Sequence, residues 1–252
     1  MGNSMKILTD CDMFMFMSAA AVEQEVCFGD TWHLFSSLAD AKRHMTDKLN
    51  YHIESALRAA HYNGDFEVIM CISDDNNFRK EVLPEYKMNR AGKRKPVCYR
   101  GLVDWVKEEF EWKQWANLEA DDVMGILSTQ NPTKSIILSG DKDMRSIPGY
   151  MYNFIQEEFY VTSEQEADYK FLYQTLIGDT TDNYKGCPGM GDKTATKLLD
   201  VTCSWEAVLA AYEKKGLTLE DAMQQARVAR ILRTGEYNVR TGEVRLWTPS
   251  NK

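Results

Sequence analysis

The 252-residue chain lacks the patterns that mark several common functional classes. Its six cysteines include no CxxC pair and its four histidines form no HExxH motif, which argues against a zinc site or a disulfide framework. No hydrophobic run is long enough to cross a membrane. The apolar stretch 13–22 follows Asp10 and Asp12 and lacks the basic start of a signal peptide. We therefore expect a cytoplasmic protein with reduced thiols.

An excess of basic residues is also missing, since the formal net charge is −8. Such a balance is unusual for a protein that binds nucleic acid. Nine acids from the clusters described below contribute nine negative charges, and the remainder of the chain carries +1; they are Asp10, Asp74, Glu119, Asp121, Asp122, Asp141, Asp143, Asp179 and Asp182. Local basic patches are therefore free to bind phosphate, so net acidity does not exclude DNA. The length and the 44% hydrophobic content suit one large domain, alone or with a small appendage.

Three short apolar runs each end at a pair of carboxylates. The runs 6–10, 68–73 and 135–139 have the composition of buried strands. The carboxylate pairs are Asp10 with Asp12, Asp74 with Asp75, and Asp141 with Asp143. Ligand sites of parallel α/β sheets lie beyond the carboxyl ends of the strands, so we expect these acids to meet in one crevice. Carboxylates that close must protonate or share cations, and Mg²⁺ or Mn²⁺ suits such a site, as in two-metal phosphodiester cleavage.

Two further acid clusters extend this pattern. Glu119, Asp121 and Asp122 stand at the start of a predicted helix, and Asp179 and Asp182 open a glycine-rich segment. Any one cluster is equally typical of a helix cap or a solvated turn. Five clusters, three of them at predicted strand ends, favour a functional site.

The alternation of strands and helices predicts an α/β fold with a central, mostly parallel sheet flanked by helices. The predicted strands are 6–10, 66–73, a short one near Trp112, 135–139 and 150–155, and the predicted helices are 13–25, 40–61, 97–109 and 119–128. From about residue 164 the sequence predicts helices, including 205–214 and 219–233. The end of the chain is predicted to form a hairpin that turns at Thr241-Gly242. We expect two regions, 5–163 and 164–252.

Residues 79–100 form a basic stretch that begins with Arg79 and Lys80 and carries eight lysines and arginines against two glutamates. A run like this is usually a solvated face. Here it directly follows an acid-tipped strand, so its cations can reach a phosphate held at the acids. Its interleaved aromatic residues suit a single strand of nucleic acid, and we interpret the stretch as a substrate arm.

A second phosphate signal lies at 186–199, where a glycine turn precedes a predicted helix. Gly189 and Gly191 form the turn, and Lys193, Thr194 and Lys197 lie on the helix. Backbone N–H groups at such a helix start bind phosphate without reading bases. The Walker order GxxxxGK[ST] is absent. The alternative is a plain loop-to-helix turn whose glycines only supply positive φ.

These segments, in this order, resemble the 5′ nuclease superfamily of flap endonucleases and 5′–3′ exonucleases, above all the small bacteriophage exonucleases and the nuclease domain of bacterial DNA polymerase I. The matching segments are ILTDCD at 7–12, CISDD at 71–75, FRKEVLPEYKMNR at 78–90, EADD at 119–122, SGDKD at 139–143, GDTTDN at 178–183 and GCPGMGDKTATKLL at 186–199. The resemblance spans about residues 6–200. It implies a PIN-like nuclease domain over 5–163 with a basic helical arch at about 76–100. It also implies a helical DNA-binding region over 164–252 with a helix–hairpin–helix-type motif at about 176–200.

The resemblance implies a metal-dependent 5′–3′ exonuclease or flap endonuclease of phage-type DNA replication or degradation, working in the cytoplasm of a bacterial host. Two Mg²⁺ ions are expected, with Mn²⁺ as a substitute. One metal position would be served by Asp10, Asp74, Glu119, Asp121 and Asp122, and the second by Asp141, Asp143, Asp179 and Asp182. Lys87 and Arg90 would approach the scissile phosphate from an arch shaped by Tyr86, and Phe16 would stack on a terminal base. Duplex backbone would be held by Gly189, Gly191, Lys193, Thr194 and Lys197, around a K⁺ ion bound by loop carbonyls.

Two departures from the family pattern leave questions open. Asp12 and Asp75 are acids at unexpected positions, so either Asp74 or Asp75 could be the ligand. The compact arch leaves open whether a 5′ flap threads through it. The expected partner of this monomer is duplex DNA with a 5′ end or a 5′ flap, and attack on an RNA–DNA hybrid is left open.

Two rival functions come from other classes. A haloacid-dehalogenase-like phosphatase would use Asp10, in its DxD at a strand end, as a covalent nucleophile. That function leaves the EADD cluster unexplained. A non-catalytic DNA-structure-binding protein would gain nothing from so many acids facing phosphate.

Overall fold

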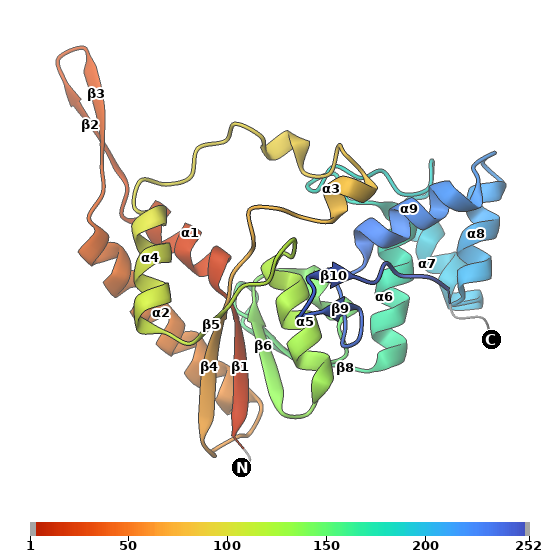
Figure 1. Ribbon diagram of the computed structural model, residues 1–252, viewed down its shortest axis with the longest axis horizontal. Helices are drawn as coiled ribbons and strands as arrows, with labels where there is room; N and C mark the ends of the chain where they lie inside the picture. The colour runs from red at the N-terminus through yellow and green to blue at the C-terminus, as the bar shows by residue number, and fades with distance from the viewer. Residues whose placement is uncertain (1–3, 250–252) are drawn as a thin grey trace.

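A six-stranded sheet with the order β5-β4-β1-β6-β7-β8 forms the centre of the computed structural model, which describes residues 4–249 (Figure 1). Its strands are β1 (Met5–Asp10), β4 (Phe66–Cys71), β5 (Trp112–Lys113), β6 (Ser135–Ser139), β7 (Gly149–Asn153) and β8 (Glu158–Thr162). Every neighbouring pair is parallel except β7 and β8, which are antiparallel. The predicted mostly parallel α/β sheet is therefore confirmed, although β8 was not predicted.

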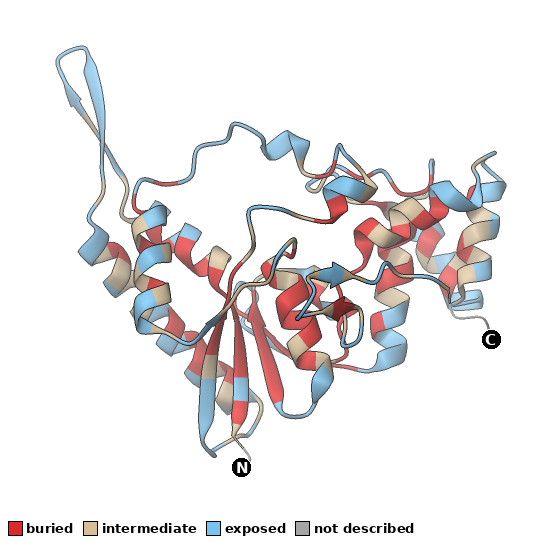
Figure 2. Cartoon of the chain, in the orientation of Figure 1, coloured by how far each residue is buried: buried red, intermediate tan, exposed pale blue. Residues whose placement is uncertain are grey.

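β1 lies in the middle of the sheet, and its register brings three strand ends together. Asp10 pairs with Cys71 at the end of β4, and Leu8 pairs with Ile137 of β6. Buried residues run through β6 and most of β1, as expected for parallel strands covered on both faces (Figure 2). The segments that follow these strands consequently leave the sheet at one edge.

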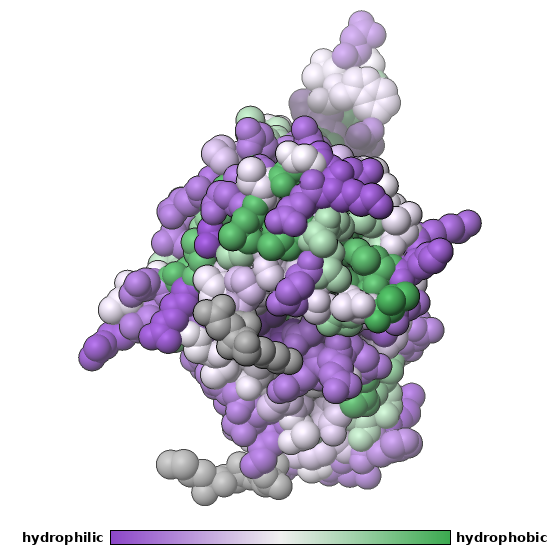
Figure 3. All heavy atoms as spheres, turned by 90° about the vertical axis from the view of Figure 1, so that its right-hand side faces the viewer, coloured by the Kyte–Doolittle hydropathy of each residue, from purple (hydrophilic) through white to green (hydrophobic). Residues whose placement is uncertain are grey.

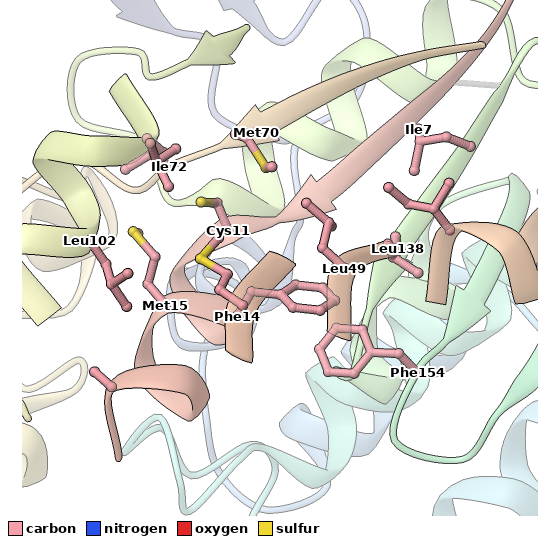
Figure 4. Packing of buried hydrophobic residues seen from close by; sticks show 14 of the residues in the cluster. Ile7, Cys11, Phe14, Met15, Leu49, Met70, Ile72, Leu102, Leu138 and Phe154 are labelled. Carbon is pink, nitrogen blue, oxygen red and sulfur yellow. The ribbon is translucent and has the colours of Figure 1, made fainter. Parts of the chain in front are cut away.

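Helices cover both faces of this sheet because successive strand residues point in opposite directions. On one face, Ile7 packs with α1 (Cys11–Ala21), α2 (Leu38–Ala59) and α4 (Tyr99–Glu109). The rings of Phe14 and Phe154 lie 4.5 Å apart within this cluster (Figure 4). On the other face, Leu8 packs with α5 (Ala120–Gln130).

The chain after the sheet folds into a helical region with its own apolar cluster. Its elements are α6 (Glu164–Ile177), α7 (Asp192–Val201), α8 (Trp205–Glu213), α9 (Leu219–Ala229), β9 (Tyr237–Asn238) and β10 (Glu243–Val244). The predicted helices and the C-terminal hairpin are confirmed, with boundaries shifted by a few residues. Hydrophilic residues cover most of the face that this region presents, with scattered apolar patches (Figure 3).

A hairpin formed by β2 (Gln24–Phe28) and β3 (Thr31–Phe35) replaces the end of the predicted helix 13–25. It projects from the body beyond α1, and nearly all of its residues are exposed (Figures 1 and 2). The sequence signal for this hairpin was the Gly29-Asp30 turn between two alternating runs, which we did not recognise.

The basic segment between β4 and α4, which we call the arch, is only partly helical. It contains α3 (Arg79–Val82) and a single 3-10 turn (Met88–Arg90) and is otherwise irregular, so the expectation of a helical arch is wrong for most of its length. The arch nevertheless crosses above the carboxyl edge of the sheet (Figure 1). Throughout residues 4–249, no helix combines the length and apolarity that a membrane span requires.

Candidate acidic site at the carboxyl edge of the sheet

Local hydrogen bonds fix the acids that follow β1 and β6. Asp10 ends β1 and caps α1, so its carboxylate accepts from the Met13 amide at 3.2 Å and from the Ser139 hydroxyl at 2.7 Å. Asp141 lies just beyond β6 and accepts from the Asp143 amide at 2.8 Å. Because β1 and β6 are adjacent and parallel, these acids meet at one edge, as predicted.

The acids line two connected hollows beneath the arch. The larger is a groove of about 350 Å³ lined by Asp10, Asp12, Met13, Phe16, Ser73, Lys87, Arg90, Glu119, Ala120, Asp121, Asp141 and Asp182. A second hollow of about 30 Å³ shares Glu119, Asp121, Asp141 and Asp182 and adds Asp143. We call the residues Asp10, Glu119, Asp121, Asp141, Asp143 and Asp182 the acid cluster.

Three members of the acid cluster repel their neighbours. Burial, with the charges of Asp12 and Asp141, raises the pKa of Asp10 to about 6. Burial and the charge of Asp141 raise the pKa of Asp143 to about 6 as well. The pKa of Asp121 is raised well above its ordinary value by burial and by Asp10 and Asp141. Negative charge is therefore concentrated here without enough cations to balance it.

The other side of the acid cluster is paired with cations of the arch. Lys87 forms ion pairs with Glu119 and, at 3.5 Å, with Asp182, which also pairs with Arg90. The Tyr86 hydroxyl lies 2.9 Å from a Glu119 oxygen and 3.0 Å from an Asp182 oxygen. Burial acts to raise the pKa of Glu119, but Lys87 and Arg79 outweigh it and lower this pKa to about 2.

The donor chemistry of the acid cluster fits hard divalent cations, since its ligands are carboxylate oxygens. One oxygen of Asp143 is buried and accepts no hydrogen bond, although the Lys170 ammonium forms an ion pair with it at 3.4 Å. Within the described residues, no three acidic side chains stand close enough to enclose an ion as they are placed. Glu119 and Asp182 are paired with Lys87 and Arg90, so an ion bound here would compete with these arch cations for the two carboxylates.

Two predicted site residues, Arg79 and Asp122, are buried in an ion pair with each other, so the roles predicted for them are wrong. Arg79, expected to bind DNA, is only 2% exposed, and Asp122, expected to bind metal, is 0% exposed. They form a bidentate ion pair, with N–O distances of 2.7 and 2.8 Å. Both Asp122 oxygens are also occupied by the backbone amides of Glu119 and Leu232. Neither side chain is therefore available to a ligand in the groove.

Two further predicted ligands lie outside the hollows. Asp74 turns toward the Asn117 amide, 2.9 Å away, and its neighbour Asp75 is exposed. Asp179 caps its own loop by accepting from the Thr181 amide at 2.6 Å. The groove instead contains Asp12, which accepts from the Ser73 amide and from the Tyr99 hydroxyl at the far base of the arch.

The remaining predicted DNA contacts are accessible. Phe16 lies beside the groove with 48% of its surface exposed. The exposed residues of the arch, of the turn before α7 and of α7 itself include Lys80, Gly189, Gly191, Lys193, Thr194 and Lys197. The first two turns of α7 therefore present the cations Lys193 and Lys197 to solvent, four residues apart on one helix face.

Sequence reasoning missed Gln174 and Lys170, which reach the acid cluster from α6. The Gln174 side-chain amide donates to Asp143 at 2.6 Å, and the Lys170 ammonium lies 3.4 Å from the other Asp143 oxygen. Their spacing of four residues places both side chains on one helix face. That spacing was visible in the sequence, but nothing there indicated which helix would face the acids.

The fold and the site together define an α/β protein with an acidic groove at the carboxyl edge of a parallel sheet, crossed by a basic arch. The chain belongs to the 5′-3′ exonuclease family: residues 31–171 match its N-terminal resolvase-like domain and residues 161–245 its C-terminal SAM fold.

Named relatives agree with this membership. The chain is 31% identical to the exodeoxyribonuclease of Enterobacteria phage T3, over 96% of this chain and 92% of that protein. It is also 31% identical to the exonuclease of Escherichia phage T7, over 96% and 93% of the two chains. A 28% identity with the DNA polymerase I of Thermus aquaticus covers 71% of this chain and 23% of that enzyme.

Solved structures share the fold. The T5 D15 protein co-crystallised with metal ions superposes with a TM-score of 0.58 at 14% identity, covering 89% of this chain and 88% of that one. The T5 5′-exonuclease with bound zinc gives the same TM-score over 90% and 93% of the two chains.

Proposed function

We propose that this protein is a metal-dependent 5′–3′ exonuclease or flap endonuclease that hydrolyses DNA phosphodiesters from a 5′ end. The observation that carries the proposal is the acid cluster, in which Lys87 and Arg90 of the arch pair with Glu119 and Asp182 while the remaining carboxylates repel one another. Family membership and the phage exonuclease relatives support the same activity.

The acid cluster is the proposed site for two divalent ions, Mg²⁺ or Mn²⁺. When bound, such ions supply a hydroxide nucleophile at neutral pH and Lewis-acid stabilisation of the leaving oxygen. Asp10, Glu119 and Asp121 would hold one position, and Asp141, Asp143 and Asp182 the other. We propose Asp12 as an additional acid near the first position, and Asp74 and Asp179 as residues that shape the loops around it.

Lys87 and Arg90 would exchange their carboxylate partners for the scissile phosphate, where fixed positive charge stabilises the charge that develops during cleavage. Tyr86 would orient Glu119 and Asp182 through its hydroxyl. Phe16 would stack on a terminal base, since an exposed ring beside the groove offers a surface that any base can use.

We further propose a nuclease domain over 5–163 and a DNA-binding helical region over 164–252. In the second region, the turn at Gly189 and Gly191 and the start of α7 would hold duplex backbone as a helix–hairpin–helix-type element, with K⁺ at its loop carbonyls. Contacts of this kind position DNA without reading sequence, so little base preference is expected.

Digestion of 5′-labelled duplex and 5′-flap DNA tests the proposal, with Mg²⁺ and with EDTA. Short labelled products from duplex would establish exonuclease activity, and release of the intact flap would establish structure-specific endonuclease activity. Asp141→Ala should lose both, whereas Asp30→Ala, an exposed change at the tip of the β2–β3 hairpin, should retain them. Intact binding without any cleavage would favour a DNA-binding protein, and a covalent phosphate on Asp10 would favour the phosphatase.

A further inference from the structure

The Arg79 guanidinium joins three parts of the molecule. Arg79 stands at the start of α3, at the near base of the arch, and its side chain is buried. Its nitrogens donate to the two Asp122 oxygens on α5 at 2.7 and 2.8 Å and to Glu119 at the start of α5 at 3.3 Å. They also donate to the Val228 carbonyl at 2.9 Å and to the Arg230 carbonyl at 2.6 Å, both at the end of α9. One side chain thereby connects the arch, the acid cluster and the helical region.

The two partners of Arg79 on α5 have different surroundings. Asp122 is enclosed, and its carboxylate is saturated by Arg79 and two backbone amides. Glu119 lines both hollows of the acid cluster. Arg79 and the Tyr86 hydroxyl both bind the same Glu119 oxygen, which leaves the second oxygen directed toward Lys87.

The carbonyls that Arg79 binds belong to a helix end. α9 ends at Ala229, so the carbonyls of Val228 and Arg230 lie where a helix leaves acceptors without intrahelical partners. A buried cation satisfies such acceptors and is stabilised by the negative end of the helix dipole. The position of Arg79 is therefore fixed from the side of α9 as well as from α5.

We propose that Arg79, paired with Asp122, is a positioning residue that fixes the Glu119 carboxylate for metal binding and couples this carboxylate to the end of α9. This inference rests on the proposed function, in which Glu119 holds a metal ion. A ligand carboxylate held in place before the ion arrives binds it more tightly than a free one, and loss of such a supporting contact typically weakens metal affinity about 10- to 100-fold.

The test is calorimetric titration of the metal-free, full-length protein with Mn²⁺. The variant Arg79→Met/Asp122→Asn removes both charges of the pair, so the net charge is unchanged and a change in affinity reports positioning. We expect its dissociation constant for Mn²⁺ to rise about tenfold. The control is Arg43→Met/Asp40→Asn, which makes the same pair of substitutions at an ion pair on α2 that touches neither the acid cluster nor Arg79, and it should stay within about twofold of wild type.

Arg79→Met alone gives a test by sign. Removing a positive charge near carboxylates strengthens cation binding by simple electrostatics, whereas losing the support of Glu119 weakens it. Weaker Mn²⁺ binding in this variant agrees with the proposal, and tighter binding overturns it. Should either Met variant fail to fold by circular dichroism, Arg79→Lys decides, because one ammonium keeps the charge but cannot reach all the acceptors.

The outcomes separate this inference from the proposed function. Wild-type protein that binds Mn²⁺ and cleaves DNA, beside an Arg79→Met/Asp122→Asn variant with unchanged Mn²⁺ affinity, overturns only the positioning role. Wild-type protein that neither binds Mn²⁺ nor cleaves DNA overturns the proposed function, and the positioning role falls with it.

Discussion

The Lys87 ammonium contacts the Glu119 carboxylate and lies 3.5 Å from Asp182, so a cation of the arch neutralises two acids that a metal ion would otherwise neutralise. Metal binding at the proposed site would therefore compete with an intramolecular ion pair. We propose that Lys87, once released from these carboxylates, acts on the scissile phosphate.

Replacing Lys87 with methionine should change metal affinity and turnover in opposite directions. We expect Mn²⁺ to bind about fivefold more tightly, which corresponds to an ion pair of roughly 1 kcal/mol. Cleavage at saturating metal should slow about 100-fold, because a cation near the developing charge is lost. Calorimetry and single-turnover digestion measure the two effects. Lys80→Met is the control for charge, because it removes an exposed lysine of the same arch, and equal Mn²⁺ affinity in the two variants would contradict the competition.

Gln174 supports the acid cluster from α6, where its amide donates to Asp143 at 2.6 Å. Gln174→Leu should reduce DNA cleavage about 10- to 100-fold, because Asp143 loses the group that orients it. The measurement is the rate of flap or duplex digestion across a Mg²⁺ titration. Gln165→Leu changes an exposed glutamine of the same helix and should behave as wild type, so equal rates in both variants would argue against a supporting role.

Gly178 allows the Asp182 loop to close against the backbone. Its φ is +71°, and an added Cβ would lie 2.4 Å from the Lys185 carbonyl carbon. Gly216 has a similar φ of +76° but open space around it. We expect Gly216→Ala to cost about 1 kcal/mol in the free energy of unfolding, and Gly178→Ala about 3 kcal/mol with loss of cleavage. Urea denaturation compares the two, and equal costs would show that the close approach is unimportant.

His52 should make the protein less stable in mild acid. The ring is buried among Phe14, Tyr51 and Phe154, and its Nδ1 has no hydrogen-bond partner. Burial, with the charge of Lys48, lowers the pKa of His52 below 6.5. The unfolded chain therefore binds the proton first, and stability is lost as the pH falls below 6.5.

Urea denaturation of wild type and His52→Leu between about pH 5 and about pH 7.5, a range over which histidine titrates, measures this effect. The variant should lose part of the pH dependence. His61→Gln, a change at an exposed histidine, should keep it. A pH dependence that survives in His52→Leu would assign the effect to other groups.

Much of the sheet and of the acid cluster could be predicted because their signals are local. Runs such as 135–139 are apolar at every position, and the residues that follow a buried parallel strand must leave the sheet at its carboxyl edge. The exposed β2–β3 hairpin was missed although Gly29-Asp30 is a turn signal, because its two short strands lie outside the central sheet and bury no apolar face. β8 was missed because an antiparallel edge strand breaks the alternation of strands and helices that we had followed.

The sequence by itself determined which chemical groups gather at the carboxyl edge, since strand ends and glycine turns are encoded by neighbouring residues. Only the tertiary structure decided which acid of each cluster faces the groove. Adjacent helical residues such as Asp121 and Asp122 point in directions about 100° apart, so one lines the groove and the other is buried against Arg79. Which of them is buried depends on Arg79 of α3 and on Leu232 just beyond α9, which lie far away in the sequence and contact Asp122 only in the folded chain.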